Sequence, residues 1–239
     1  MEFWQEANRK NQCLRSEYSV NSLLLFPTTM DERPHIHATY NEVHTIIKES
    51  AAKISQSFKP DVLIAIGGGG FFPARVLRTF FKDPLTKKNI PIRAIGLSLY
   101  EPLVDTSAEK IGTEIIRTQW LGADGIKSLL GRKALIVDEI DDSRTTLQYA
   151  LSELQKDIEL QLLDLPESER EANRTEFAVF VVHNKSKPKV GILPPNVPYF
   201  AGAEVGNVWL EYPWEALDIE EHDRLAAQDR LKSQEPSNP

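Results

Sequence analysis

The sequence predicts an α/β fold in which a twisted, mainly parallel sheet is flanked by helices. Short apolar runs at residues 61–66, 134–137 and 177–182 alternate with helical patterns. Apart from Asp61 at the start of the first, each run is apolar throughout, which is typical of strands buried on both faces of a sheet. Glycines follow the first run and polar residues follow the other two, and ligands of such sheets bind at the carboxyl ends of the strands.

The elements follow in order along the chain. Residues 41–58 carry Val43, Ile47 and Ile54 on one face, which predicts an amphipathic helix that ends before Pro60. Residues 100–110 lose all periodicity and predict a long loop of the kind that covers a binding site. The other expected elements are strands at 61–66, 92–99, 111–120, 177–182, 199–203 and 207–212, and helices at 73–81, from about 147 to about 163 and after 220.

The chain divides into three parts by composition. Residues 1–39 are aperiodic and are expected to form an N-terminal extension. Residues 40–222 carry the alternating pattern and predict one domain. Residues 223–239 are polar and predict a C-terminal tail.

Composition excludes several classes of protein. The net charge is −7, from 35 acids against 28 bases, which argues against a nucleic-acid surface. Cys13 is the single cysteine, so no internal disulfide and no multi-cysteine metal site can form. No apolar run is long enough to span a membrane. These features predict a cytoplasmic protein.

An acidic run follows the apolar residues 134–137. Asp138, Glu139, Asp141 and Asp142 come first, and Ser143, Arg144, Thr145 and Thr146 then lead into a helix. A helix N-terminus offers free backbone N–H groups and a partial positive charge, so it binds anions. Carboxylates beside an anion site indicate a phosphorylated substrate with hydroxyl groups or a metal. The alternative is that these acids are solvated carboxylates at a helix cap. This alternative is more plausible for Asp142 than for Asp138 and Glu139.

Four consecutive glycines, Gly67, Gly68, Gly69 and Gly70, connect a strand to a helix. Their uncovered N–H groups suit a pyrophosphate, although a simple tight turn is an alternative. A dinucleotide-binding loop is disfavoured, because Phe72 stands where its third glycine is needed.

These stretches, with Tyr100, Arg117, residues 183–185 and residues 209–214, resemble the fungal-type 6-oxopurine phosphoribosyltransferases from about residue 40 to about residue 222. Within that family the chain resembles the xanthine enzymes more than the hypoxanthine-guanine enzymes. The resemblance implies the type I phosphoribosyltransferase fold, with a small hood and a flexible active-site loop. It also implies the substrate phosphoribosyl pyrophosphate (PRPP), Mg2+ as cofactor and a homodimer.

The family's roles are expected on matching residues. The resemblance implies that Asp138 and Glu139 bind the ribose hydroxyls and the metal. It also implies that residues 141–146 bind PRPP, with residues 143–146 at its 5′-phosphate. Gly67 to Gly70, Tyr100 and Arg117 would bind pyrophosphate, with a nonproline cis peptide in the glycine loop. Arg144 and Thr145 depart from the glycine often found in the phosphate turn. A solvated strand residue is an equal alternative for Arg117.

The purine is expected to meet a second group of residues. Asp142 matches the position that contacts purine N7, so it is the predicted general base. Trp209 would stack on the ring, with the Leu210 backbone and Glu211 at its edge. Lys185, or with less support His183, would bind O6. Ordinary core and surface positions are the alternatives for Trp209 and Lys185.

The acid Glu211 predicts a preference for xanthine and guanine over hypoxanthine, because it can accept from an amino group or an N–H near C2. Two other functions remain open at this point. One is a PRPP-sensing regulator without catalysis, and the other is a transferase for a different base. A regulator is expected to carry a DNA-binding domain, and residues 1–39 are too short and not basic enough to form one. Trp209 and Lys185 count against a transferase for a different base.

Overall fold

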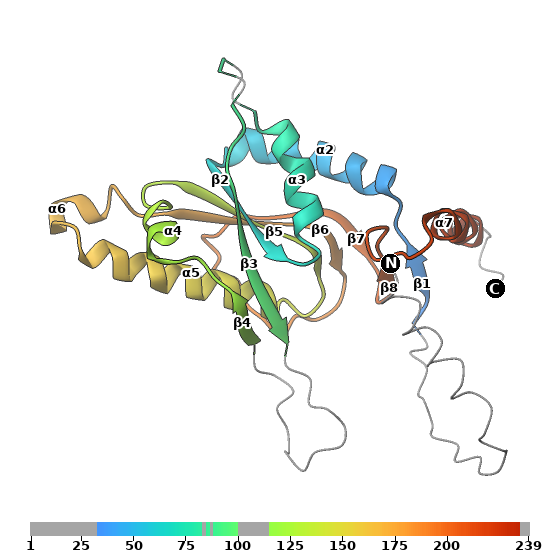
Figure 1. Ribbon diagram of the computed structural model, residues 1–239. Coiled ribbons are helices and arrows are strands. Elements are labelled where there is room, and N and C mark those ends of the chain that lie inside the picture. The colour runs from blue at the N-terminus through green and yellow to red at the C-terminus, as the bar shows by residue number, and fades with distance from the viewer. Residues whose placement is uncertain (1–32, 83–84, 87, 100–114, 235–239) are drawn as a thin grey trace, which may run out of the picture. The chain divides into compact units, whose positions relative to one another are not determined.

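The computed structural model describes residues 33–82, 85–86, 88–99 and 115–234, all within one compact unit (Figure 1). The predictions for residues 1–32 and for the loop at 100–110 lie outside the described residues.

Six of the described strands form one sheet, in the order β4-β3-β2-β5-β6-β7. All neighbouring strands run parallel except β3 and β4. The α/β fold with a mainly parallel sheet is therefore confirmed. The strands are β2 (Val62–Gly67), β3 (Ile92–Leu99), β4 (Ile115–Gln119), β5 (Lys133–Asp141), β6 (Glu176–Lys185) and β7 (Tyr199–Val205).

Helices cover both faces of this sheet, because successive strand residues point to opposite sides. In β2, Leu63 packs in a core cluster with α2 (Tyr40–Ser57) and α3 (Phe71–Phe80). Its neighbour Ile64 belongs to the opposite cluster, with α5 (Thr145–Leu163). Two short helices, α4 (Ala123–Lys127) and α6 (Glu167–Arg170), were not predicted.

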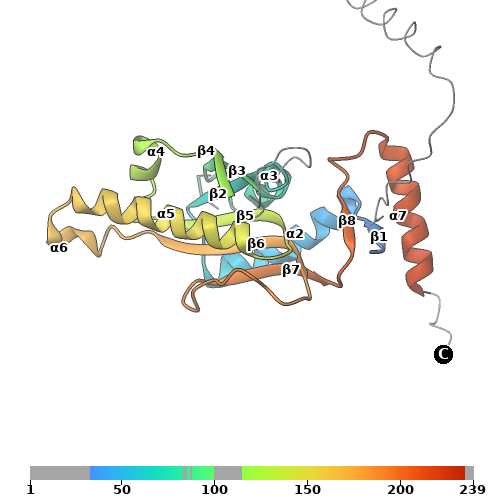
Figure 2. The ribbon, with the colours of Figure 1, turned by 90° about the horizontal axis from the view of Figure 1, so that it is seen from below.

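A second, two-stranded sheet forms a small hood at one end of the molecule (Figure 2). In it β1 (His35–His37) pairs in parallel with β8 (Trp209–Glu211), and α7 (Ile219–Gln234) packs against β1. The Nδ1 atom of His37 lies 2.8 Å from Oδ2 of Asp229 on α7. We call β1, β8 and α7 the hood.

The hood crosses both expected domain boundaries. Strand β1 lies before residue 40, and α7 runs through residue 222. The division of the chain into three parts at residues 39 and 222 stays a prediction. None of the helices in the described part of the chain is long and apolar enough to cross a membrane.

Candidate active site

A cavity of about 290 Å³ lies at the carboxyl ends of β2, β3 and β5, where a sheet of this kind binds ligands. Strands β2 and β5 are parallel neighbours, so the segments that follow them meet although they are far apart in the sequence. Residues 67–69, 138–144 and 146 contribute to the lining. The cavity thus brings together most of the predicted glycine loop, the acidic run and the helix start.

The glycines connect β2 to α3. The peptide bond between Gly67 and Gly68 is cis, as the family resemblance implies. A Cβ atom on Gly69 would lie 1.9 Å from the carboxyl carbon of Glu139. A Cβ atom on Gly70 would lie 2.5 Å from one carbonyl oxygen in β2 and one in β5. Glycine at these two positions therefore lets the loop approach both the acid and the sheet.

Asp138 and Glu139 form a crowded acid pair inside the cavity, and only 8% of the surface of Asp138 is exposed. Burial raises the pKa of Asp138 well above its usual value, and the negative charges of Glu139 and Asp141 raise it further. Oε2 of Glu139 is buried and has no hydrogen-bond partner among the described residues. Neither acid forms an ion pair with a basic side chain of the described residues, so the pair suits hydroxyl donors or a hard cation.

Asp141 lines the cavity, but its carboxylate is directed at protein groups. Its Oδ2 accepts from Nε of Arg144 at 2.9 Å and from the hydroxyl of Tyr199 at 2.8 Å. Burial raises the pKa of Tyr199, and its hydrogen bond to Asp141 raises it further, so the hydroxyl remains a donor. These contacts indicate that Asp141 braces the turn, and its predicted contact with PRPP stays a prediction.

The turn between β5 and α5 has the expected form of an anion site. Helix α5 begins at Thr145, whose N–H donates to the Ser143 hydroxyl at 3.4 Å. The N-cap residue Arg144 makes no side-chain capping bond, so the other N–H groups of the first turn can serve a ligand. Arg144 just before it has φ +68°, in the left-handed region that favours glycine. The guanidinium of Arg144 lies 4.7 Å from the centre of the Tyr199 ring. The side chain of Arg144 is thus held at Asp141 and Tyr199.

Asp142 and Lys185, both expected near the purine, lie in contact. Nζ of Lys185 donates to Oδ2 of Asp142 at 2.6 Å, and Lys187 pairs with the other carboxylate oxygen. Burial would raise the pKa of Asp142, but the two lysines outweigh it and hold the pKa below its usual value. Lys185 itself is only 4% exposed. Asp142 is therefore a carboxylate at neutral pH.

His183 does not fit the predicted role of a cation near purine O6. It is buried at the end of β6, and its Nδ1 lies 2.9 Å from the hydroxyl of Tyr212. Burial lowers the pKa of His183 to about 4, so the ring is neutral at pH 7. The Tyr212 hydroxyl in turn donates to the backbone oxygen of Glu139 at 3.0 Å. This chain connects the segment after β8 to the acid pair.

The predicted purine-edge residues lie in the hood and do not line the cavity. Trp209 is 43% exposed, with its ring 6.1 Å from that of His35. Leu210 is buried, and Glu211 Oε1 lies 2.9 Å from Nδ1 of His35. These contacts leave the predicted roles at the purine edge as proposals.

The two remaining pyrophosphate candidates also receive no support. Arg117 on β4 faces α5, where it pairs with Glu153 and lies 3.9 Å from Asp157. Its guanidinium is 4.2 Å from the centre of the Trp120 ring. This placement favours the structural alternative for Arg117. Tyr100 lies outside the described residues.

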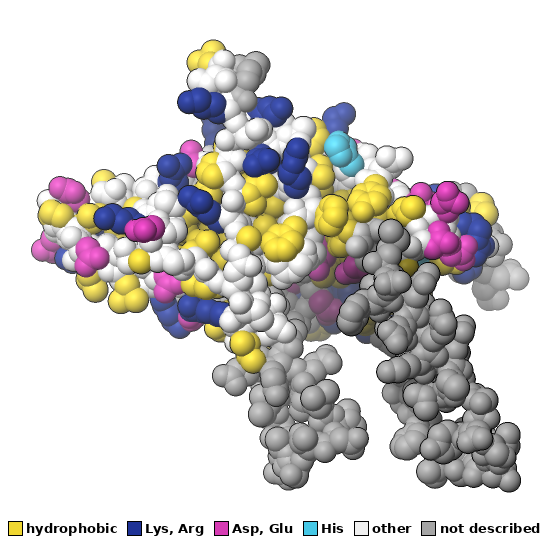
Figure 3. All heavy atoms as spheres, in the orientation of Figure 1, with side chains coloured by type: hydrophobic (Ala, Val, Ile, Leu, Met, Phe, Trp, Pro, Cys, Tyr) yellow, Lys and Arg dark blue, Asp and Glu magenta, His cyan; other side chains and the backbone are white. Residues whose placement is uncertain are grey.

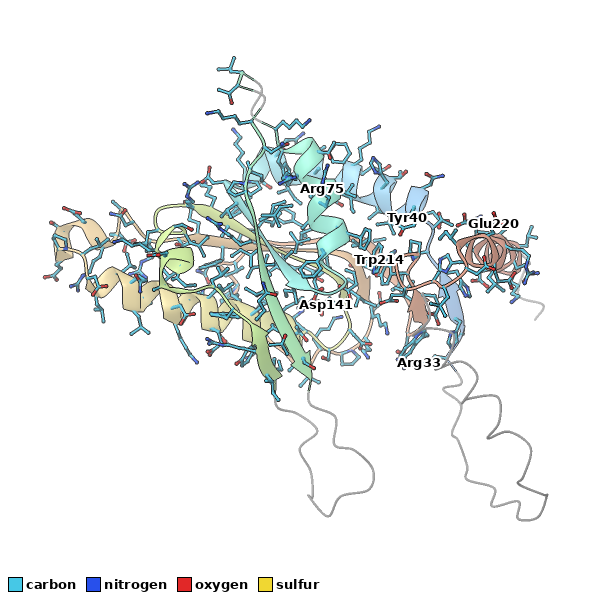
Figure 4. All side chains as sticks on the ribbon, in the orientation of Figure 1. Arg33, Tyr40, Arg75, Asp141, Trp214 and Glu220 are labelled. Atoms are coloured by element: carbon cyan, nitrogen blue, oxygen red, sulfur yellow. The ribbon has the colours of Figure 1, made fainter. Side chains whose placement is uncertain are left out.

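Sequence reasoning missed several residues that shape the site. Lys187 and Lys189 follow Lys185 at alternate positions, a pattern that could have marked one lysine-lined edge. Trp214, labelled in Figure 4, stacks on Tyr212 with ring centres 4.6 Å apart and on Phe72 of α3 at 5.2 Å. This aromatic stack joins α3 to the segment after β8, and nothing in the spacing of its residues predicts it.

Comparison with known proteins agrees with this arrangement. Residues 39–160 match the phosphoribosyl transferase domain family. The chain is 52% identical to the hypoxanthine-guanine phosphoribosyltransferase of Schizosaccharomyces pombe, over 80% of this chain and 94% of that protein. It is 48% identical to xanthine phosphoribosyltransferase 1 of Saccharomyces cerevisiae, over 82% of this chain and 97% of that protein.

A solved structure of a hypothetical protein from Neisseria gonorrhoeae with bound ppGpp is also similar. It has a TM-score of 0.66 and 38% identity, over 84% of this chain and 100% of that chain. The chain therefore belongs to the phosphoribosyltransferase family. Both curated relatives have names of purine enzymes, and their identities do not single out the xanthine enzyme.

Proposed function

We propose that this protein is a purine salvage enzyme that joins a 6-oxopurine to PRPP. The products are the nucleoside 5′-monophosphate and pyrophosphate, and xanthine, guanine and hypoxanthine are the candidate bases. The observation that carries the proposal is the single cavity lined by the glycine loop, the acid pair and the start of α5. The names of the two curated relatives support a 6-oxopurine as the acceptor.

The parts of PRPP fit the parts of the cavity. The 5′-phosphate would sit at the N-terminus of α5, with the hydroxyls of Ser143, Thr145 and Thr146 nearby. The ribose hydroxyls would donate to Asp138 and Glu139. The pyrophosphate would lie against the glycine loop. Because this loop approaches Glu139 closely, the pyrophosphate and the ribose hydroxyls of one PRPP molecule can share the site.

The reaction exchanges one bond at ribose C1 for another. The bond from C1 to the pyrophosphate oxygen breaks and its electron pair leaves with pyrophosphate, while a purine nitrogen supplies the pair for the new C1–N bond. Positive charge spreads over the ribose ring in the transition state, and the carboxylates of the acid pair stabilise it.

Asp142 is our candidate for the group that accepts the proton lost by the purine. At rest Lys185 and Lys187 hold its pKa low, which makes it a weak base. If Lys185 turns to the purine O6 when the base binds, Asp142 loses one of these two cations, and its proton affinity rises. The exchange would couple binding of the base to activation of the carboxylate.

The acid pair fits a magnesium ion. Mg2+ takes one or two carboxylates and completes its shell with water and substrate phosphates. Among the residues that the structure describes, no group of three His, Cys, Asp or Glu side chains forms a fuller metal site. Asp138 and Glu139, whose Oε2 is unpartnered, would hold the ion. When bound, the ion supplies positive charge that neutralises the leaving pyrophosphate.

The choice of base, the assembly and the location complete the proposal. Glu211 would favour xanthine and guanine over hypoxanthine. We further propose a cytoplasmic homodimer. Hydrophobic side chains gather around α3 (Figure 3), and the half-exposed rings of Phe71 and Phe72 beside the glycine loop support burial against a second copy. Light scattering during size-exclusion chromatography would test the homodimer, and the mass of a monomer would contradict it.

Initial rates with PRPP and each of the three bases, with and without Mg2+, test the activity. We expect product with at least one base and strong dependence on the metal. Binding of PRPP without any product would instead favour the regulator. Product only with another base would favour the different transferase. A competition among the three purines gives the preference directly.

A further inference from the structure

Four residues after β6 lie against the turn that starts α5. We call residues 189–192 the bracing segment. The N–H groups of Val190 and Gly191 both donate to the backbone oxygen of Ser143, at 3.0 and 2.9 Å. The last N–H of the segment donates to Oε1 of Gln148 on α5 at 2.8 Å. The segment is thus bonded to both the turn and the helix behind it.

The side chain of Lys189 adds to this brace. Its Nζ donates to the backbone oxygens of Asp141 and Asp142, at 2.6 and 3.0 Å. With Ser143, three consecutive carbonyl groups of the turn are therefore held by the bracing segment. In a trans peptide the C=O and N–H groups point in opposite directions. The N–H groups of the same peptides are consequently directed away from the bracing segment and can serve an anion.

Gly191 makes the closest approach. A Cβ atom there would lie 2.4 Å from the backbone oxygen of Arg144 and 2.9 Å from the nitrogen of Thr145. Arg144 has a left-handed backbone, which is unfavourable for a residue with a Cβ atom. Contacts from outside the turn are needed to hold such a conformation.

We propose that the bracing segment positions the turn for the 5′-phosphate, and that Lys189 is its main positioning residue. The inference rests on the proposed function and deepens it, because it assigns control of PRPP affinity to residues outside the acidic run. Lys189 acts through the backbone of the turn and through the Asp141 carboxylate, whose Oδ1 lies 3.5 Å from its Nζ, and it does not touch the reacting atoms. Lys189 also holds the backbone oxygen of Asp142, but the carboxylate of Asp142 is paired with Lys185 and Lys187. We therefore expect the purine end of the cavity to change little when Lys189 is replaced.

The test compares steady-state kinetics of three variants. Lys189→Met keeps the length of the side chain but removes the donor, so we expect KM for PRPP to rise about tenfold. We expect kcat and KM for the purine to stay within about twofold. Lys189→Arg keeps a charged donor and should recover most of the affinity. Val190→Ala is the matched control, because its side chain is exposed and its N–H remains.

Binding of ribose 5-phosphate, measured by calorimetry, separates this inference from the proposed activity. Weaker binding by Lys189→Met, with Val190→Ala unchanged, supports the inference even if no turnover is found. If Lys189→Met only lowers the melting temperature and binds normally, the segment is merely structural and the inference fails. It also fails if the unmodified protein does not bind ribose 5-phosphate. Gly191→Ala gives a second route to the same answer if Lys189→Met does not fold.

Discussion

Replacing Asp142 by asparagine removes the proposed base while keeping its shape. General-base catalysis contributes about 10²- to 10⁴-fold in rate, so we expect kcat to fall by at least about two orders of magnitude. Such a loss equals about 2.7 kcal/mol or more in the activation barrier. The carboxylate of Asp142 contacts Lys185 and Lys187 rather than the start of α5, so KM for PRPP should change little.

The same change also affects stability, because Lys185 loses its carboxylate partner while it stays 4% exposed. Loss of one partner of a buried pair costs about 3–5 kcal/mol, but the side chain of Asp142 is 38% exposed and solvent screening reduces this cost. We expect about 1–2 kcal/mol, or a melting temperature lower by about 2–8 °C. Thermal unfolding measures this loss.

Rates must therefore be expressed per folded molecule, below the melting transition. Lys187→Met is the matched control, because it removes one partner of Asp142 and keeps the carboxylate. It should lose less than about tenfold in kcat. Asp142→Asn with more than half of the normal rate would refute the assignment of the base.

The other predictions concern the cavity and the hood. Gly69→Ala should push the Glu139 carboxylate aside and lower activity with little loss of stability. Gly70→Ala meets backbone atoms and should cost about 1–3 kcal/mol of stability in thermal unfolding. Equal effects of the two variants on activity and on thermal unfolding would contradict this. Glu139→Gln should raise the Mg2+ concentration for half-maximal rate about tenfold, and an unchanged titration removes Glu139 from the metal site. Glu211→Ala should change the ratio of xanthine to hypoxanthine rates, and a constant ratio excludes Glu211 from specificity. The pKa of His183 falls to about 4 on folding, so the unfolded state binds the extra proton and stability should decline as pH drops from about 6.5 to 4; His183→Gln should flatten this decline.

The main strands could be predicted because buried parallel strands are apolar along their whole length. The run at 134–137 marked the centre of β5, but the strand continues to Asp141. Its acidic end pairs with β6, and Ile140 lies opposite His183 in that register. The three-residue β1 carries no period long enough to detect, and its pairing with β8 and its packing against α7 stabilise it.

The site was predictable where one local segment carries a chemical pattern. The glycines and the acidic run are such segments, and the sheet brings them into one cavity. Arg117 and His183 were harder, because their partners come from other elements. Neither Glu153 beside the first nor Tyr212 beside the second follows from spacing along the chain. The sequence likewise does not reveal that Lys189 holds the backbone of a turn more than forty residues away.

The aromatic stack gives the molecule an internal optical probe. The indole of Trp214 lies almost parallel to the rings of Tyr212 and Phe72, with angles of 9° and 8°. Tyr212 is bonded to the backbone of the acid pair, so a movement of that pair on filling the cavity would be transmitted to the indole. Its fluorescence would then report occupancy in real time, without a label and without turnover.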